Sequence, residues 1–190
     1  MLTLKRLDEA QLRETYRLRM RRDFPESELK PLGTMVRMLR AGVYDALGVF
    51  DGGKLSVYAL IYRRAGGSVL LLDYLAVEPS RRGQGMGSAA IEMIREHYHT
   101  EASAMFIECE RPEYAPDPAG AQSRIRFYVH AGAQLTDICV TLFGVEFLVL
   151  CMPLGKGDIP SDCRAELLAV YRDMLGPALF ERNVQMHGVR

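Results

Sequence analysis

The chain has 190 residues, of which 48% are hydrophobic and 25% charged, a composition typical of a globular protein that buries a sizeable core. Its 24 basic and 24 acidic residues cancel, so no net field favours nucleic acid or an anionic membrane as a partner. No apolar run reaches the length of a membrane span, and the first residues lack a signal-peptide core. The four cysteines show no metal-ligand spacing, which predicts a cytoplasmic protein without a metal.

The N-terminal part of the chain predicts one strand, two helices and a hairpin. Asp8 is placed to cap the first helix, and residues 51–53 form a glycine-containing turn between two strands. A loop at residues 24–31 leads into the second helix. The elements expected here are a strand at 2–6, a helix from 8 to about 22, a helix at 32–40, and strands at 43–50 and 55–63.

The remaining elements complete a mixed α/β pattern of the α+β type. They are a strand at 69–77, a helix ending near 98, a strand at 104–110, a short helix at 124–131, strands at 137–142 and 144–152, and a helix at 160–175. This order predicts a mostly antiparallel central sheet flanked by helices. We expect a single domain, with a core over residues 2–152 and a helical extension over 153–190.

The most informative segment joins the strand at 69–77 to the helix that follows. It carries glycines at every second position, Gly83, Gly85 and Gly87. A glycine-rich turn that opens a helix presents unpaired backbone N–H groups at the positive end of the helix dipole, which is a site for phosphate. Arg81 and Arg82 are expected to add positive charge beside it.

Two common phosphate-binding templates do not fit this turn. A Walker loop needs a lysine after the glycines, and a dinucleotide fingerprint that starts at Gly83 needs a glycine where Ser88 stands. The run from Arg82 to Gly87 instead fits Arg/Gln-x-x-Gly-x-Gly/Ala, and it follows a strand that ends in Leu-Ala-Val. This segment resembles the acetyl-CoA loop of the GNAT family of N-acetyltransferases. The alternative is a turn that only connects strand to helix.

The resemblance covers about residues 2–152 and implies an enzyme that moves an acetyl group from acetyl-CoA to a primary amine of a small molecule or protein. It implies that loop amides hold the CoA pyrophosphate and that strand backbone pairs with the pantetheine arm, with the Val77 N–H as a candidate oxyanion donor. The cofactor-binding residues so implied are Leu75, Ala76, Val77, Arg82, Gly83, Gln84, Gly85, Met86, Gly87 and Ser88. The oligomeric state is left open, with a homodimer as one option.

A second segment, residues 124–133, is similar to the family's Tyr-x-x-x-Gly-Phe motif, with Tyr128 at the tyrosine position. The resemblance implies that Tyr128 protonates the leaving CoA thiolate; the alternative is a core aromatic. The chain departs from the family where Ala133 replaces phenylalanine and Ala121 replaces a frequent asparagine. Residues 111–123 are expected to form a long, proline-containing loop that shapes the acceptor site.

The general base is the least determined assignment. Strand alternation puts Glu108 and Glu110 on one face of the strand at 104–110, with Glu110 as first choice and Glu108 as second. Asp73 and Tyr74 compete with them, and each glutamate alone is also compatible with a solvated strand end. The competing function is a non-catalytic acyl-CoA-binding module of the same fold.

Overall fold

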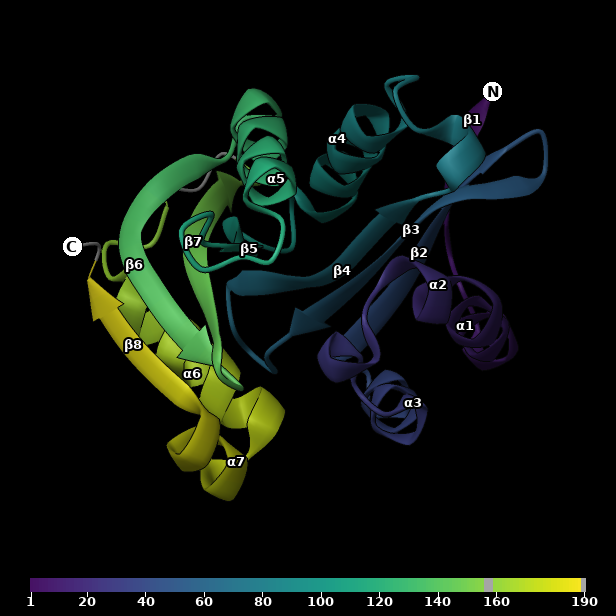
Figure 1. Ribbon diagram of the computed structural model, residues 1–190. Helices are drawn as coiled ribbons and strands as arrows, with labels where there is room; N and C mark the ends of the chain where they lie inside the picture. The colour runs from purple at the N-terminus through teal and green to yellow at the C-terminus, as the bar shows by residue number, and fades with distance from the viewer. Residues whose placement is uncertain (156–158, 189–190) are drawn as a thin grey trace.

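The computed structural model describes residues 1–155 and 159–188, which form one eight-stranded sheet with helices on both faces (Figure 1). The strand order is β1-β2-β3-β4-β5-β7-β6-β8. Strands β4 and β5 pair in parallel, and all other neighbouring strands of the sheet pair antiparallel. The strands are β1 Leu2–Arg6, β2 Tyr44–Asp51, β3 Lys54–Arg63, β4 Val69–Val77, β5 Ala104–Glu110, β6 Gln134–Leu142, β7 Val145–Pro153 and β8 Val184–Gly188. The expected mixed, mostly antiparallel sheet is confirmed.

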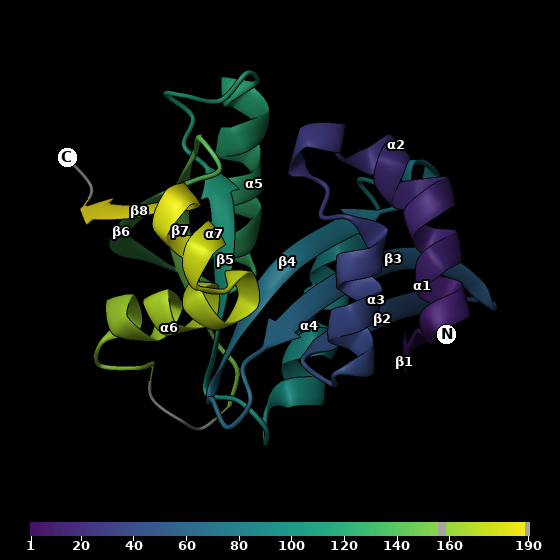
Figure 2. The ribbon, with the colours of Figure 1, turned by 90° about the horizontal axis from the view of Figure 1, so that it is seen from below.

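The helices divide between the two faces of the sheet. Helices α4 and α5 pack on one face, and α1 to α3 together with α6 and α7 pack on the other. Their bounds are α1 Glu9–Thr15, α2 Arg21–Asp23, α3 Leu32–Arg40, α4 Met86–Tyr98, α5 Pro118–His130, α6 Cys163–Leu175 and α7 Pro177–Asn183. Seen from below, α1–α3 and α6–α7 stand on either side of the line along which β4 and β5 part (Figure 2).

The first helix begins where the sequence predicts it. The Asp8 carboxylate accepts a hydrogen bond from the Gln11 N–H at 2.8 Å, and the Gln11 side chain accepts one from the Asp8 N–H at 3.0 Å. This reciprocal pair satisfies two amide donors at the end of α1. A π-helical segment at Tyr16–Met20 joins α1 to α2, so the helical run reaches Asp23.

Strands β4 and β5 separate at the centre of the sheet. They pair only from Val69–Ala104 to Leu72–Ile107, and beyond this register the last five residues of β4 have no partner on β5. The register of β3 against β4 shifts at the same place, so Asp73 forms a bulge without a partner on β3. The separation starts at the bulge and leaves one edge of β4 open toward α5.

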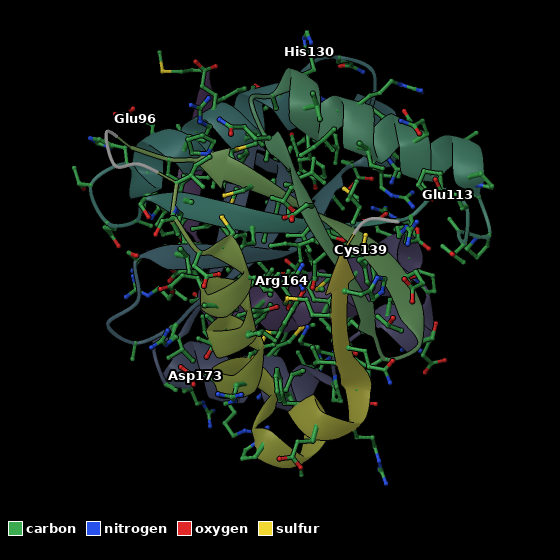
Figure 3. The ribbon with its side chains drawn as sticks, turned by 90° about the vertical axis from the view of Figure 1, so that its left-hand side faces the viewer. Glu96, Glu113, His130, Cys139, Arg164 and Asp173 are labelled. Carbon is green, nitrogen blue, oxygen red and sulfur yellow. The ribbon has the colours of Figure 1, made fainter. Side chains whose placement is uncertain are left out.

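Two parts of the chain differ from the sequence prediction. Helix α5 begins at Pro118 and not near residue 124, because Asp117 caps the Gly120 N–H and a proline suits the first turn. The expected loop at 111–123 is therefore a short segment of about seven residues ahead of α5. The C-terminal extension is also more than one helix, since α7 follows α6 and β8 extends the sheet along β6 (Figure 3).

Candidate active site

The glycine turn and the start of α4 form one wall of the site. Gly83 and Gly85 have φ of +71° and +76°, and a Cβ atom built on either would meet nothing within 4 Å. Gly85 is the N-cap of α4, and no side chain in the described part of the chain caps this end. The first helical N–H groups, those of Met86, Gly87 and Ser88, therefore remain available to an anion.

Gly87 has a different role from the other two glycines. A Cβ atom at this position would lie 3.1 Å from two ring atoms of Phe127 on α5 and 3.6 Å from the Val77 side chain. The absence of a side chain here lets α4 approach α5 and the end of β4. The packing that results places the helix N-terminus beside the open edge of β4.

The two arginines of the turn are already paired. The Arg81 guanidinium donates to the Asp51 carboxylate, and Arg82 donates through Nε to the Val77 carbonyl at 3.1 Å and approaches the buried Asp23 carboxylate at 3.4 Å. The Arg82 N–H donates to the Pro79 carbonyl at 3.3 Å. These contacts brace the turn, so the free amide donors begin at Gly83 and the positive field comes mainly from the helix.

The open edge of β4 offers the backbone of two residues. The Glu78 N–H donates to the Ser56 carbonyl of β3 at 2.8 Å. Because backbone groups alternate between the two sides of a strand, those of Ala76 also face β3, where Ala76 pairs with Tyr58. Those of Leu75 and Val77 point to the side that β5 has left. Ala76, expected to hold the cofactor through its backbone, is thus engaged in the sheet.

Tyr128 lies on α5, on the same face of the sheet as α4. Its ring packs edge-on against Phe127, with 4.9 Å between ring centroids, and, like Leu75, it packs against the core cluster that contains Cys109. Among the described residues its hydroxyl has no hydrogen-bond partner. Burial, with Cys109 nearby, raises the pKa of Tyr128, so the phenol keeps its proton near neutrality and is able to donate it.

Glu108 and Glu110 lie on the opposite face, as strand alternation predicts, with Cys109 turned toward α5. Glu108 accepts a hydrogen bond from the hydroxyl of Tyr171 on α6. Burial raises the pKa of Glu108 to about 7, against the lowering effects of Tyr171 and of the Lys30 charge. Glu110 is paired with Arg124 of α5. The two glutamates therefore differ: Glu108 is partly buried without a cation in contact, and Glu110 is neutralised.

Asp73, at the bulge of β4, completes this acidic face. Its carboxylate accepts hydrogen bonds from the Tyr44 hydroxyl and from the Lys30 ammonium group, the latter at 2.6 Å, and its side chain is only 4% exposed. The two charges act in opposite directions on the pKa of Glu108, which Lys30 lowers and Asp73 raises. Sequence reasoning did not identify Tyr44, Lys30 or Tyr171, because each reaches the site from an element distant along the chain.

The family departures at positions 121 and 133 are buried in the structure. Ala121 lies within α5 with no exposed surface, and Ala133, the residue before β6, is 5% exposed. Among residues 1–155 and 159–188, no group of three His, Cys, Asp or Glu side chains is arranged to hold a metal ion. Nor does this part of the chain contain a helix long and apolar enough to cross a membrane.

No protein-family model and no curated protein sequence matches the chain. Solved structures do. A putative acetyltransferase of the GNAT family from Bacteroides thetaiotaomicron has a TM-score of 0.70 at 17% identity, over 92% of this chain and 99% of that chain. The ribosomal-protein-S18-alanine N-acetyltransferase from Escherichia coli has a TM-score of 0.61 at 16% identity, over 85% and 98% of the two chains. Spermidine N-acetyltransferase from Vibrio cholerae, described as dodecameric, has a TM-score of 0.62 at 12% identity, over 80% and 94%. The chain thus has the fold of the GNAT acetyltransferases.

Proposed function

We propose that the protein is an acetyl-CoA-dependent N-acetyltransferase that acts on a primary amine of a small molecule or a protein. The observation that carries the proposal is the opening between β4 and β5, which has an unpaired helix N-terminus at one end, Tyr128 on one face and the partly buried Glu108 on the other. A proton acceptor thus lies on one face and a proton donor on the other. Acyl transfer from a thioester to an amine uses both, because the ammonium must lose a proton before it attacks and the leaving thiolate gains one.

The residues present fit acetyl-CoA as the co-substrate. The amides of Gly83 to Ser88 and the dipole of α4 suit the pyrophosphate, and the space above Gly83 and Gly85 leaves room for it. The Leu75 backbone suits the amides of the pantetheine arm, which hydrogen-bond like peptide groups, whereas the Val77 carbonyl already accepts from Arg82. The thioester supplies the activated acetyl group, and the Val77 N–H is our candidate donor to the developing oxyanion.

The protein groups divide the proton transfers between them. Glu108, with a pKa of about 7, is ionised in a substantial fraction of molecules at neutral pH and is our candidate base for the incoming ammonium, directly or through water. Tyr128, protonated at the same pH, is our candidate donor to the leaving sulfur. We therefore prefer Glu108 to Glu110 as the base, whereas the position along the strand favoured Glu110. The reason is that Arg124 holds Glu110 in an ion pair.

The test has two stages. Calorimetric titration with CoA measures whether the site binds, and a thiol-release assay with acetyl-CoA and a panel of amines, including polyamines and peptides with free amino groups, measures turnover. We expect saturable CoA binding and thiol release that depends on an amine. Binding without thiol release from any acceptor would favour a non-catalytic acyl-CoA-binding module, and absence of binding would refute both functions.

A further inference from the structure

One lysine side chain lies inside the acidic face. The chain has four lysines among its 24 basic residues, namely Lys5, Lys30, Lys54 and Lys156. Lys5 and Lys54 are exposed, and Lys156 lies outside the described residues. The Lys30 side chain is only 20% exposed, and its Nζ lies 2.6 Å from Asp73 Oδ1, at the bulge where β4 and β5 begin to separate.

The backbone of Lys30 is held at the same place. Its N–H donates to the Tyr74 hydroxyl at 2.9 Å, and that hydroxyl donates to the Glu28 carbonyl at 2.7 Å. The Lys30 Nζ also lies 5.5 Å from the centroid of the Tyr74 ring. Both ends of the lysine are thus fixed against β4, and its ammonium group is placed on the face that carries Glu108, opposite Tyr128.

Building on the proposed acetyl-CoA site, we propose that Lys30 is an internal acetyl acceptor, so that the enzyme acetylates its own Lys30 Nζ. Lys30 loses one proton to Glu108 by way of the Asp73 carboxylate, which holds its Nζ at 2.6 Å, and its nitrogen lone pair forms a bond to the carbonyl carbon of the thioester. The carbon–sulfur bond breaks, and the thiolate leaves with a proton from Tyr128, which regains one from the acylated nitrogen. The products are acetyl-Lys30, CoA thiol and one proton released through Glu108 to solvent.

An ion pair alone does not explain a lysine at this position. The chain uses arginine for most of its basic residues, and arginine would bind Asp73 through two N–H groups. Only lysine combines a positive charge with a nitrogen that becomes nucleophilic once deprotonated. Acetylation would remove the charge that joins residues 24–31 to Asp73, while the Tyr44 hydroxyl would still satisfy that carboxylate. The Asp73 carboxylate would then lack a cation and would attract the ammonium group of an external amine.

The experiment is peptide mass mapping of the full chain during incubation with acetyl-CoA. We expect Lys30 to be acetylated at least about tenfold faster than Lys5 and Lys54, because its Nζ is fixed against Asp73, where β4 and β5 begin to separate. The rate constant should not depend on protein concentration, since the transfer is intramolecular. Gly85→Glu should abolish the modification, and Glu108→Gln should slow it. Lys5→Arg is the matched control and should leave Lys30 acetylation unchanged.

A second readout does not depend on turnover. Lys30→Gln, which imitates the neutral acetylated side chain, should lower the melting temperature, whereas Lys30→Arg should preserve it because it keeps a cation beside Asp73. Acetylation of Lys30 no faster than that of the exposed lysines, or at a rate that rises with protein concentration, would overturn the inference. If thiol release with external amines continued in that case, the proposed function would stand and only self-acetylation would fail.

Discussion

Glu108 is predicted to make the folded protein less stable as the pH rises toward neutrality. Its carboxyl group has a pKa of about 7 in the folded chain, compared with an ordinary value of 4.5, because burial disfavours the charge. A pKa difference of one corresponds to about 1.4 kcal/mol, so the rise corresponds to about 3 kcal/mol. Replacing Glu108 by glutamine removes the charge and keeps an oxygen that accepts the Tyr171 hydrogen bond.

The direction of this pH dependence follows from which state of the chain, folded or unfolded, binds the Glu108 proton more tightly. Below pH 4.5 the carboxyl is protonated in both the folded and the unfolded chain, and its contribution to stability is fully present. Between pH 4.5 and 7 the folded chain binds the proton more tightly, so the free energy of unfolding falls as the pH rises. Above about pH 7 this contribution of Glu108 to the free energy of unfolding is lost completely. The free energy of unfolding of Glu108→Gln minus that of the wild type should therefore be about 3 kcal/mol larger above pH 7 than at low pH.

Urea unfolding of both proteins at a series of pH values measures this difference in the free energy of unfolding. The contributions of groups that titrate in both proteins cancel in the difference. Glu96→Gln is the matched control, because the Glu96 side chain is 81% exposed. A difference between Glu108→Gln and wild type that does not vary with pH would refute the raised pKa. In activity, kcat/KM of the wild type should fall about tenfold per pH unit on the acidic side of the Glu108 pKa, and the variant should lose both this limb and most of its rate.

The remaining predictions concern the other groups of the site and one helix end. Tyr128→Phe should keep CoA affinity but lower kcat by about 10²-fold, the usual effect of removing a general acid, and a near wild-type kcat would make Tyr128 a packing residue only. Gly85→Glu should abolish CoA binding in calorimetry; Gly144→Glu imposes a similar positive-φ strain at the β6–β7 turn and should leave binding intact. Asp8→Ala should lower the free energy of unfolding by about 1 kcal/mol in urea titrations, since it removes the cap of α1.

The features that sequence predicted best are those that depend on neighbours along the chain. The glycine turn, the strand before it and the helix after it are local, and Asp8 caps α1 through Gln11 three residues later. The early start of α5 also had local signals, Asp117 and Pro118, but they lay in a proline-containing stretch that favours a loop. The β8 strand depends on pairing with β6, and its five residues carry no pattern that fixes this partner.

The candidate site was predicted in outline and not in detail. Alternation put Glu108 and Glu110 on one face of β5, which the structure bears out, but it held no information on what faces them. Glu110 meets Arg124 of α5, and Glu108 meets Tyr171 of α6, 63 residues away along the chain. Because these partners decide which carboxylate is free to accept a proton, the choice of base requires the tertiary structure.

The C-terminal extension contributes one residue, Tyr171, to the candidate site. Tyr171 of α6 is fully buried in the same core cluster as Phe106 of β5, and its hydroxyl reaches Glu108. Burial raises the pKa of Tyr171, so the phenol keeps its proton and donates it to the Glu108 carboxylate in a hydrogen bond. Without α6, Glu108 would lose this donor and gain water, and its pKa would return toward 4.5. The residues beyond the part that resembles the family therefore set the proton affinity of the proposed base.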